Sequence, residues 1–422
     1  MTGRKTEYKK LLIVGHNCLS KSGSNGRTLA NYLQGWPKEK LAQLYIHAEL
    51  PDFEICNRYF CITDSSVVKS LLKRKPAGYI VKPINEKKAS TTSSVKKKNS
   101  LLFLMREFAW RSKLWNSHDL SKWVAEFQPE RILVQAGDAG FLFKIAEDIS
   151  RKYNAPLIVY NTEGYYFKDV SYFSENIFSK YCYPFLHWTF KKAYDSLVAH
   201  SKTEIYNCNL LQADYKAVYH NKSYVIMNTS EFTQEEVFRP KKKRMIYAGN
   251  LGLSRHKSLI EFARALHDVD KNMYVDVYGK IPNDQIAAEL NRCKQICFHG
   301  FISYEELKQE LRESQYLLHV ESFDSFYKED LKYAFSTKIA DSLASGGCLF
   351  VYAPENMAVC NYLKGTDAAV LITKRDKLVQ SIKAVLEDED KCATISRNGR
   401  ELAEKNHNIK KNREKFQKLL LN

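Results

Sequence analysis

The amino-acid sequence predicts an α/β protein with two Rossmann-like, doubly wound domains. Its 422 residues are about twice the size at which single domains usually stop growing. Short apolar runs alternate with longer segments of helical periodicity, which is typical of parallel strands joined by crossover helices. The same alternation restarts after the basic cluster Lys241 to Lys243. A composition of 44% hydrophobic and 27% charged residues excludes a collagen, a wholly disordered chain and a disulfide miniprotein.

Ten apolar runs are the strand candidates, and they divide evenly between the two halves of the chain. They are Lys10 to Gly15, Arg131 to Gln135, Pro156 to Tyr160, Ser196 to His200, Tyr224 to Met227, Arg244 to Gly249, Met273 to Gly279, Tyr316 to Val320, Cys348 to Tyr352 and Ala368 to Ile372. A loop and the Lys241 to Lys243 cluster separate the halves. We therefore expect domains at residues 1–239 and 240–396. Residues 397–422 read as a charged helix that packs back on the first domain.

The chain is strongly basic, because 65 Lys and Arg residues face 48 Asp and Glu residues, a net charge of +17. This charge favours an acidic partner such as nucleic acid, anionic lipid or a phosphorylated substrate. No apolar run approaches the roughly 18 residues that cross a bilayer. The charged N-terminus lacks the pattern of a secretion signal, so we expect a cytoplasmic protein. The ten cysteines contain no C-x-x-C pair and are interpreted as reduced thiols rather than zinc ligands.

Much of the positive charge lies between Lys69 and Lys113, where thirteen Lys and Arg residues accompany two acids. Within this segment Glu86 to Ser100 lacks aromatic residues and is expected to be a mobile loop. The residues from Leu101 to Trp115 interleave large apolar and basic side chains, which suits docking on an anionic membrane surface. A solvated basic loop followed by a buried helix explains the same pattern, and both interpretations stay open. A second unusual segment, Tyr165 to Phe190, holds eleven aromatic residues, for core packing or for the wall of an acceptor site.

Two glycine turns stand where a strand is expected to pass into a helix. In the first turn, Gly23 and Gly26 would let backbone N–H groups approach an anion, although an ordinary turn fits equally. Its spacing matches neither the dinucleotide fingerprint nor the P-loop. The second turn runs from Gly249 and Asn250 to Arg255 and Lys257. Two cations at the carboxyl edge of a doubly wound sheet fit a diphosphate and stabilise its charge as it leaves, whereas a solvated helix start is the simpler alternative.

Further candidates follow in the second half of the chain. Phe301 precedes the expected helix Tyr304 to Glu313, and the strand Tyr316 to Val320 leads into Glu321. Next comes Phe335-Ser336-Thr337-Lys338, in which Ser336 is a suitable N-cap, and then a helix that carries Asp341. Carboxylates in these positions suit binding of the hydroxyl groups of a sugar and a ribose, because each oxygen accepts two hydrogen bonds.

The succession YAGNLGLSRHKSL, FHGFISYEEL, Glu321 and FSTKIADSLASGG resembles the donor domain of GT-B glycosyltransferases. It is most similar to the retaining family 4 enzymes of bacterial surface and capsular polysaccharide synthesis, and the resemblance covers Arg244 to about Leu420. It implies two Rossmann-like domains facing an interdomain cleft. It further implies that Arg255 and Lys257 hold the donor diphosphate, Glu321 contacts the donor sugar and Asp341 contacts the ribose. The remaining residues expected at the donor are Gly23, Gly26, Gly249, Asn250, Phe301, Ser336, Thr337 and Lys338.

Two departures from the family pattern concern its paired acids. Nineteen residues separate Glu321 from Asp341, where the family usually has seven, so Phe323 to Tyr333 is expected to be an inserted loop. The second acid is also Asp instead of Glu, which shortens its reach by one methylene. The ribose contact therefore follows less directly from the resemblance than the phosphate contact does.

The sequence thus predicts a hexosyltransferase that uses a UDP or GDP sugar. The resemblance implies retention, without a metal or cofactor, because Arg and Lys replace the metal. The acceptor is expected to be a hydroxyl of a lipid-linked or oligosaccharide substrate, with the protein peripheral on the inner face of the membrane. The leaving phosphate is expected to take the acceptor's proton; if a protein base takes part, the candidates are Asp138, Glu163 and His118. The alternatives are a nucleotide-sugar epimerase of the same fold and a non-catalytic basic binding protein. No nucleic-acid-binding signature is present.

Overall fold

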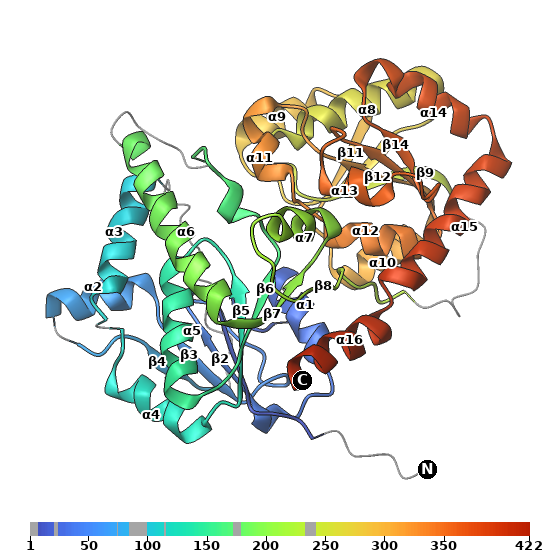
Figure 1. Cartoon of the computed structure of the whole chain (residues 1–422). Helices are drawn as coiled ribbons and strands as arrows, with labels where there is room; N and C mark the ends of the chain where they lie inside the picture. The colour runs from blue at the N-terminus through green and yellow to red at the C-terminus, as the bar shows by residue number, and fades with distance from the viewer. Residues whose placement is uncertain are drawn as a thin grey trace, which may run out of the picture. The chain divides into compact units, whose positions relative to one another are not determined.

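The computed structural model describes residues 7–20, 24–73, 75–83, 99–113, 115–171, 179–232 and 242–422. The chain divides into two compact units. The first unit comprises Met1–Asn207, Leu211–Ile226 and Arg413–Asn422, and the second comprises Cys208–Leu210 and Met227–Asn412. Each unit is an α/β domain with its own sheet, which confirms the predicted fold class (Figure 1).

The described part of the first unit is built on an eight-stranded sheet in the order β4-β3-β2-β1-β5-β6-β7-β8. The strands are β1 Leu11–Gly15, β2 Leu41–Tyr45, β3 Arg58–Cys61, β4 Tyr79–Val81, β5 Arg131–Ala136, β6 Leu157–Asn161, β7 Ser201–Tyr206 and β8 Ser223–Val225. All neighbouring pairs are parallel except the edge pair of β3 and β4. The helices that connect or cover the strands are α1 Ser24–Leu33, α2 Asp64–Lys73, α3 Ser100–Arg111, α4 His118–Phe127, α5 Gly140–Tyr153, α6 Tyr183–His200, α7 Asn209–Lys216 and the C-terminal α16 Ile409–Leu421.

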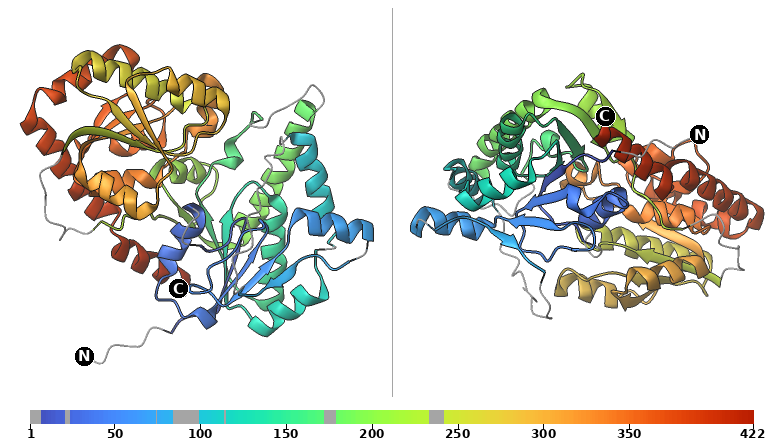
Figure 2. Two further views of the ribbon diagram at one scale, coloured as in Figure 1. Left: turned by 180° about the vertical axis from the view of Figure 1, so that it is seen from behind. Right: turned by 90° about the horizontal axis from the view of Figure 1, so that it is seen from below.

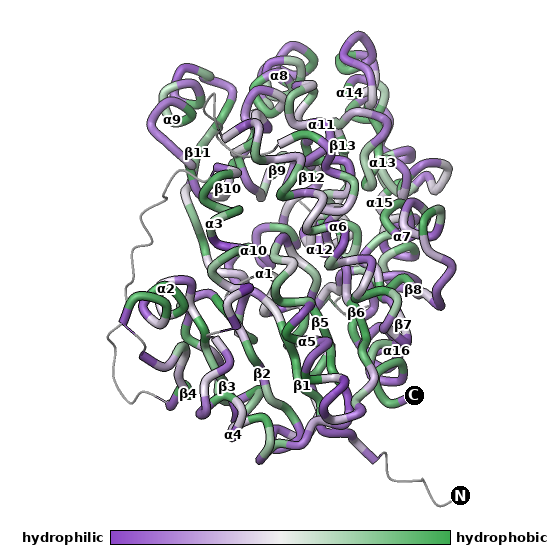
Figure 3. Tube along the Cα trace, turned by 60° about the vertical axis from the view of Figure 1, so that its left-hand side comes forward, coloured by the Kyte–Doolittle hydropathy of each residue, from purple (hydrophilic) through white to green (hydrophobic). Residues whose placement is uncertain are grey.

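The central strands of this sheet are buried along their whole length because helices cover both faces. Every residue of β1, β2 and β6 is buried. Because both faces of such a strand are buried, its sequence is mostly a run of hydrophobic residues. Figure 3 shows β1 and β5 largely in the hydrophobic colour. The covering helices are seen from behind and from below in Figure 2.

The end of the chain belongs to the first unit. Phe416 of α16 stacks on Tyr32 of α1 with the ring centroids 4.7 Å apart, and Phe416 is fully buried. Gln417 Nε2 donates to the Tyr32 carbonyl at 2.9 Å. The chain therefore passes between the units after Ile226 and again after Asn412. The sequence placed the boundary at 239/240, which falls in residues 233–241, outside the described part of the chain.

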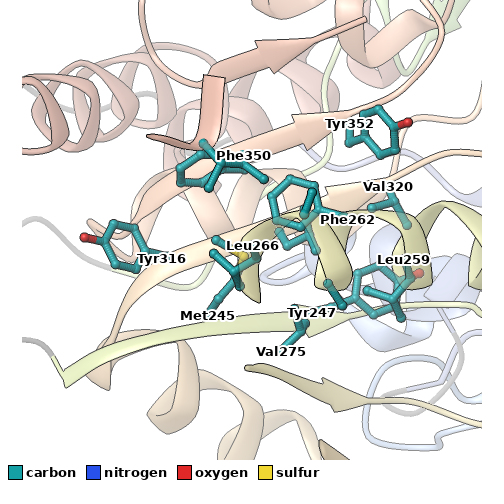
Figure 4. Packing of buried hydrophobic residues seen from close by; sticks show 14 of the residues in the cluster. Met245, Tyr247, Leu259, Phe262, Leu266, Val275, Tyr316, Val320, Phe350 and Tyr352 are labelled. Carbon is teal, nitrogen blue, oxygen red and sulfur yellow. The ribbon is translucent and has the colours of Figure 1, made fainter. Parts of the chain in front are cut away.

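The described second unit contains a six-stranded, all-parallel sheet in the order β11-β10-β9-β12-β13-β14. Its strands are β9 Lys242–Ala248, β10 Val275–Tyr278, β11 Ile296–Gly300, β12 Ser314–Val320, β13 Cys348–Tyr352 and β14 Val370–Ile372. Its helices are α8 Arg255–Val269, α9 Asp284–Asn291, α10 Tyr304–Glu313, α11 Lys328–Leu331, α12 Thr337–Ala344, α13 Ala358–Leu363, α14 Leu378–Leu386 and α15 Glu389–Asn406. Figure 4 shows Phe262 of α8 packed among Tyr247, Phe350 and Tyr352 from the strands.

Nine of the ten predicted strands are present, and one is wrong. Ser196 to His200 forms the end of helix α6, and the strand β7 begins only at Ser201. Leu197 and Val198 are buried on one side of that helix, and a short apolar run of this kind does not distinguish a strand from a buried helix. The predicted loop Phe323 to Tyr333 includes a 3-10 turn, Ser325–Tyr327, and the short helix α11. The single charged helix expected at the end is two helices, α15 and α16.

The predicted mobile loop Glu86 to Ser100 lies outside the described residues up to position 98. Its last two residues are ordered by α3: Asn99 caps the helix by accepting from the Leu102 amide at 2.9 Å, and Ser100 is its first residue. Among the described residues, no helix has both the length and the apolar character needed to cross a bilayer.

Candidate active site

In the second unit the candidate residues stand at the carboxyl edge of the sheet, in the turn that joins β9 to α8. The Tyr247 hydroxyl donates to the Asn250 carbonyl at 2.9 Å, and the Gly252 amide donates to Asn250 Oδ1 at 2.8 Å. The side chain of Asn250 therefore shapes the turn. Gly249 lies against the neighbouring turn, because a Cβ on Gly279 would stand 2.4 Å from its carbonyl oxygen. The turn delivers Arg255 as the first residue of α8.

Arg255 and Glu321 form an ion pair that the sequence did not suggest. Arg255 Nε donates to Glu321 Oε2 at 2.7 Å, and the two side chains are only 12% and 2% exposed. Arg255 comes from the start of α8, and Glu321 directly follows β12, the strand beside β9. The predicted diphosphate ligand and the predicted sugar ligand are thus in direct contact. This leaves the terminal nitrogens of a fixed guanidinium beside a buried carboxylate.

His319 completes this group and was missed by sequence reasoning. Its Nε2 lies 3.2 Å from Glu321 Oε1. Burial by itself raises the pKa of Glu321, but the interaction with His319 and the charge of Arg255 outweigh it, so the pKa is lowered and the group is a carboxylate. The signal was available: His319 and Glu321 are two residues apart at the end of a strand and therefore share one face.

Lys257 is not part of this group. Residues two apart on a helix face different directions, and the Lys257 side chain is exposed. It lies toward Glu289 of α9, whose pKa it helps to lower, after Gln285 and His256. The two cations predicted to act together at the diphosphate are therefore separated in the structure.

An exposed aromatic ring marks the next part of the same edge. Phe301, directly after β11, is 70% exposed. Lys280, which follows the adjacent strand β10, places its Nζ 4.7 Å from the centroid of that ring. Along the edge, Phe301, Lys280, Arg255 and Glu321 thus follow four consecutive strands of the sheet, β11, β10, β9 and β12.

The expected ribose ligand Asp341 is nearly buried, at 4% exposure, and has partners within the second unit. Its Oδ1 accepts from the Ser230 hydroxyl at 2.8 Å and from the Tyr304 hydroxyl at 3.1 Å. Ser336 is the N-cap of α12, as predicted, because its Oγ accepts from the Lys338 amide. Thr337 and Lys338 are the first two residues of that helix, and both are half-buried.

In the first unit, Gly26 is the third residue of α1 and is not in the loop before it. A Cβ at this position would stand 2.3 Å from the Cys18 carbonyl oxygen, so the glycine allows the helix to approach the end of β1. Gly23, the other glycine of the predicted anion-binding turn, lies outside the described residues.

Of the three candidate bases, Asp138 lies next to a histidine, His16. Asp138 Oδ1 lies 3.0 Å from Nε2 of His16, and both side chains are mostly buried. His16 follows β1, and His47, from the loop after β2, faces it at a ring centroid distance of 5.6 Å. Gly137 leaves the space that the His16 ring fills, since a Cβ there would stand 2.3 Å from His16 Cε1. Neither histidine was identified from the sequence.

Glu107 of α3 joins this cluster. Burial raises its pKa to about 7, and the nearby charge of Asp138 adds to the shift, although Arg106, Arg111 and the Gly140 amide oppose it. His16, His47, Glu107 and Asp138 are referred to below as the first-unit cluster. It lies at the carboxyl ends of β1, β2 and β5. By contrast, His118 is exposed at the start of α4, and Glu163 is half-buried in the loop after β6.

The raised pKa of Glu107 predicts a pH-dependent stability. The folded chain keeps this proton up to about pH 7, whereas the unfolded chain releases it near the ordinary value of 4.5, so stability is lost as the pH rises across this window. We expect Glu107→Gln to increase the free energy of unfolding by about 1–3 kcal/mol at pH 8 and to leave it almost unchanged near pH 4.5. Urea unfolding at both pH values measures this. Equal stability of variant and wild type at pH 8 would refute the shift, and the exposed Glu39→Gln is the control.

Comparison with known proteins gives a family resemblance for part of the chain and a fold for the whole of it. Residues 255–418 match the family model described as "Glycosyl transferase-like". The match begins at Arg255 and includes Glu321 and Asp341. No curated protein sequence matches the chain significantly.

Solved structures of low sequence identity share the whole fold. A structure of HepE from Anabaena in complex with UDP and glucose has a TM-score of 0.63 at 12% identity, covering 98% of this chain and 99% of that one. Sucrose-phosphate synthase from Thermosynechococcus elongatus has a TM-score of 0.61 at 12% identity, with 97% of each chain covered. A mutant of S. aureus TarM in complex with UDP and other ligands has a TM-score of 0.58 at 9% identity, with 98% and 100% covered. The chain therefore has the GT-B fold, with two Rossmann-like domains.

Proposed function

We propose that this protein is a glycosyltransferase that moves a sugar from a nucleoside diphosphate sugar to a hydroxyl group. The observation that carries this proposal is the buried Arg255–Glu321 pair at the carboxyl edge of the second sheet, where doubly wound folds bind their ligands. The family match over residues 255–418 and the GT-B fold support it. The HepE structures contain UDP, UDP with glucose, or UDP-glucose, which makes a UDP sugar the first donor to test.

The order of side chains along the edge suggests how the donor binds. The exposed Phe301 ring offers a stacking surface for the base. Lys280, whose Nζ lies 4.7 Å from the centroid of that ring, offers a cation for the phosphates. Arg255 binds the diphosphate through the guanidinium nitrogens that Glu321 does not occupy, and Glu321 accepts hydrogen bonds from the sugar hydroxyls. Ser336, the N-cap of α12, offers the amides at the start of that helix as further donors. The Gly249 amide already donates to the Tyr278 carbonyl at 3.1 Å, so Gly249 shapes the turn and does not itself bind the phosphates. Lys257 remains a proposed diphosphate ligand only if its long side chain turns away from Glu289.

The chemistry proposed for this donor site needs no metal. As the anomeric C–O bond breaks, charge develops on the β-phosphate, and a fixed guanidinium stabilises it without reorganising. The acceptor oxygen forms the new bond on the same face, and its proton moves to the leaving phosphate, which gives retention. Asp341 keeps its proposed ribose contact by exchanging a hydrogen bond from Ser230 or Tyr304 for one from the ribose.

We expect Phe301→Ala to weaken UDP binding, because stacking of a base on an aromatic ring contributes about 1–3 kcal/mol, or roughly five- to 150-fold in Kd. Isothermal titration with UDP measures the change. Tyr274→Ala is the matched control, because this exposed ring precedes β10 at the opposite edge of the sheet. Unchanged affinity of Phe301→Ala would remove the stacking role, while an equal loss in both variants would indicate a general effect on folding.

The first-unit cluster is the proposed acceptor side. His16, held by Asp138, accepts a hydrogen bond from the acceptor hydroxyl and fixes its orientation. Glu107, with a pKa of about 7, gives this region a carboxyl group that changes charge near neutral pH. We propose that the second unit binds the donor and that the first unit binds the acceptor. The acceptor proposed is a lipid-linked sugar or oligosaccharide of surface polysaccharide synthesis, reached from the inner face of a membrane.

One experiment tests the function as a whole. Incubation with a panel of UDP and GDP sugars, together with a lipid extract as acceptor, should release nucleoside diphosphate from one donor and transfer its labelled sugar to the lipid fraction. Release of neither nucleotide nor sugar from any donor would contradict the proposal. Interconversion of a free nucleotide sugar without transfer would instead identify an epimerase of this fold.

We expect full activity to persist in excess chelator. Loss of activity in chelator would contradict the proposed metal independence.

A further inference from the structure

Exposed apolar side chains are concentrated on three helices of the first unit. Helix α2 exposes Val68, Leu71 and Leu72, at spacings of three and four residues. Helix α3 exposes Leu101, Met105 and Phe108 at spacings of four and three, with Leu102 beside them. Phe185 and Trp188 of α6 are exposed, as is Tyr181 in the 3-10 turn Ser179–Cys182 that precedes it. The exposed fraction reaches 77% at Leu72 and 60% at Met105.

The exposed apolar residues of α2 and α3 are not needed to pack these helices against the core. Val67 of α2 and Trp110 of α3 are buried, so both helices already have a core-facing side. Phe103 and Leu104 of α3 pack on Tyr183 and Leu186 of α6. By contrast, the neighbouring helix α4 exposes His118, Asp119, Lys122 and Glu126 and keeps its apolar residues inside. Exposed apolar side chains that gather on adjoining helices in this way usually mark an interaction site.

Helix α3 is a neighbour of both other helices. α3 contacts α2, α6 and the 3-10 turn Ser179–Cys182 that precedes α6. Figures 1 and 2 show α3 beside α6, and α2 at the end of α3 that lies away from the start of α6. The exposed apolar residues of these elements, namely Val68, Leu71, Leu72, Leu101, Leu102, Met105, Phe108, Tyr181, Phe185 and Trp188, are called the helical apolar face below.

The charge around this face is positive. Exposed basic residues stand on the same elements or directly beside them: Lys69, Lys73, Lys75, Arg111, Lys113 and Lys180. Among the described residues of α2, α3 and positions 179–194, the acids are Asp64 and Glu107. Asp64 is neutralised by Arg106, whose Nε donates to it at 2.8 Å, and the pKa of Glu107 is raised to about 7 by burial and by Asp138. An apolar stripe flanked by Lys and Arg is the pattern of a helix that lies in an anionic lipid interface.

We propose that the helical apolar face docks the first unit on an anionic lipid bilayer, with the apolar side chains inserted at the headgroup boundary and the Lys and Arg residues on the lipid phosphates. The same helix α3 carries Glu107 of the first-unit cluster on its other side, so docking brings the proposed acceptor site to the lipid surface. The inference names the membrane partner of the proposed function and rests on that function for its purpose. The alternative is that the helical apolar face binds a protein partner.

The test is flotation of the full chain with vesicles of phosphatidylcholine alone and of an equimolar mixture with anionic phosphatidylglycerol, at low and high salt. The wild type should float with the anionic vesicles and much less with the neutral ones, and high salt should release it, because surface attraction is screened. The double variant Leu72→Glu, Met105→Glu should lower the partition coefficient by at least about tenfold, because both apolar insertion and charge attraction are lost. Val379→Glu, at a residue 48% exposed on α14 of the second unit, is the matched control and should bind like wild type.

Several outcomes would overturn the proposal. Equal flotation of the double variant and the wild type would exclude this face as the docking site. Equal flotation with neutral and anionic vesicles would exclude the phosphate contacts. Absence of flotation combined with self-association that the double variant abolishes would assign the face to a second copy of the chain. Hydrolysis of the donor sugar in solution needs no membrane, so the double variant should retain it; a protein that docks but releases no nucleotide would contradict the proposed function and leave the docking intact.

Discussion

Arg255→Lys is expected to reduce sugar transfer about 10²- to 10³-fold while the protein stays folded, because preorganised donors aimed at developing charge typically contribute that much. Lysine retains one positive charge but has neither the fork of N–H donors nor the Nε that bonds Glu321 at 2.7 Å. Release of nucleoside diphosphate from the best donor, measured as kcat and KM, gives the effect. We expect the loss mainly in kcat, because the charge appears in the transition state.

The choice of lysine follows from the ion pair. Alanine at position 255 would leave Glu321 buried without its cation, and breaking such a pair costs about 3–5 kcal/mol. We therefore expect Arg255→Ala to destabilise the fold as well as to impair transfer. Arg264→Lys, an exposed arginine on the same helix, is the control. Wild-type kcat in folded Arg255→Lys would show that this guanidinium does not act on the leaving group.

Asp138→Asn is expected to lower transfer to the acceptor about 10²-fold without changing the Kd for UDP, because misplacing one reacting group by about 1 Å costs that much. Asparagine is similar in shape but loses the charge that holds His16, whose Nε2 lies 3.0 Å away. His16→Asn should reproduce the effect, and the double variant should be no worse than either single variant if the two residues act as a unit. Incorporation of labelled sugar into the lipid extract measures all three.

Asp119→Asn, at an exposed carboxylate of α4, controls for the loss of a charge in the first unit. A structural role for Asp138 would appear as a lower melting temperature with unchanged transfer at low temperature. That result, or strictly additive losses in the double variant, would contradict the proposed acceptor pair.

The sequence was sufficient for the fold class because buried parallel strands are apolar along their whole length. β1 and β13 each stood out as a continuous hydrophobic run, whereas the edge strands β4 and β11 are only partly buried and carry weaker signals. The helix break at His407 depends on tertiary contacts. His407 is fully buried, its pKa is lowered to about 4 by burial, and its Nδ1 lies 2.6 Å from the Asn228 carbonyl.

The sequence predicted which residues belong to the donor site, but not that Arg255 and Glu321 form an ion pair. Motif spacing located Arg255, Glu321 and Phe301 at strand ends, yet it could not show that the first two contact each other or that Lys257 faces α9. The first-unit cluster was still less accessible, because His16, His47 and Asp138 come from loops that meet only when three parallel strands align their carboxyl ends. The space that Gly137 leaves for the His16 ring is likewise a property of the folded chain.

The most direct test of the account is a crystal structure of the protein soaked with UDP. The account predicts that the diphosphate lies within hydrogen-bonding distance of the Arg255 guanidinium at the end of β9 and that the uracil lies on the Phe301 ring. UDP bound elsewhere on the chain, with the Arg255–Glu321 pair unoccupied, would contradict it.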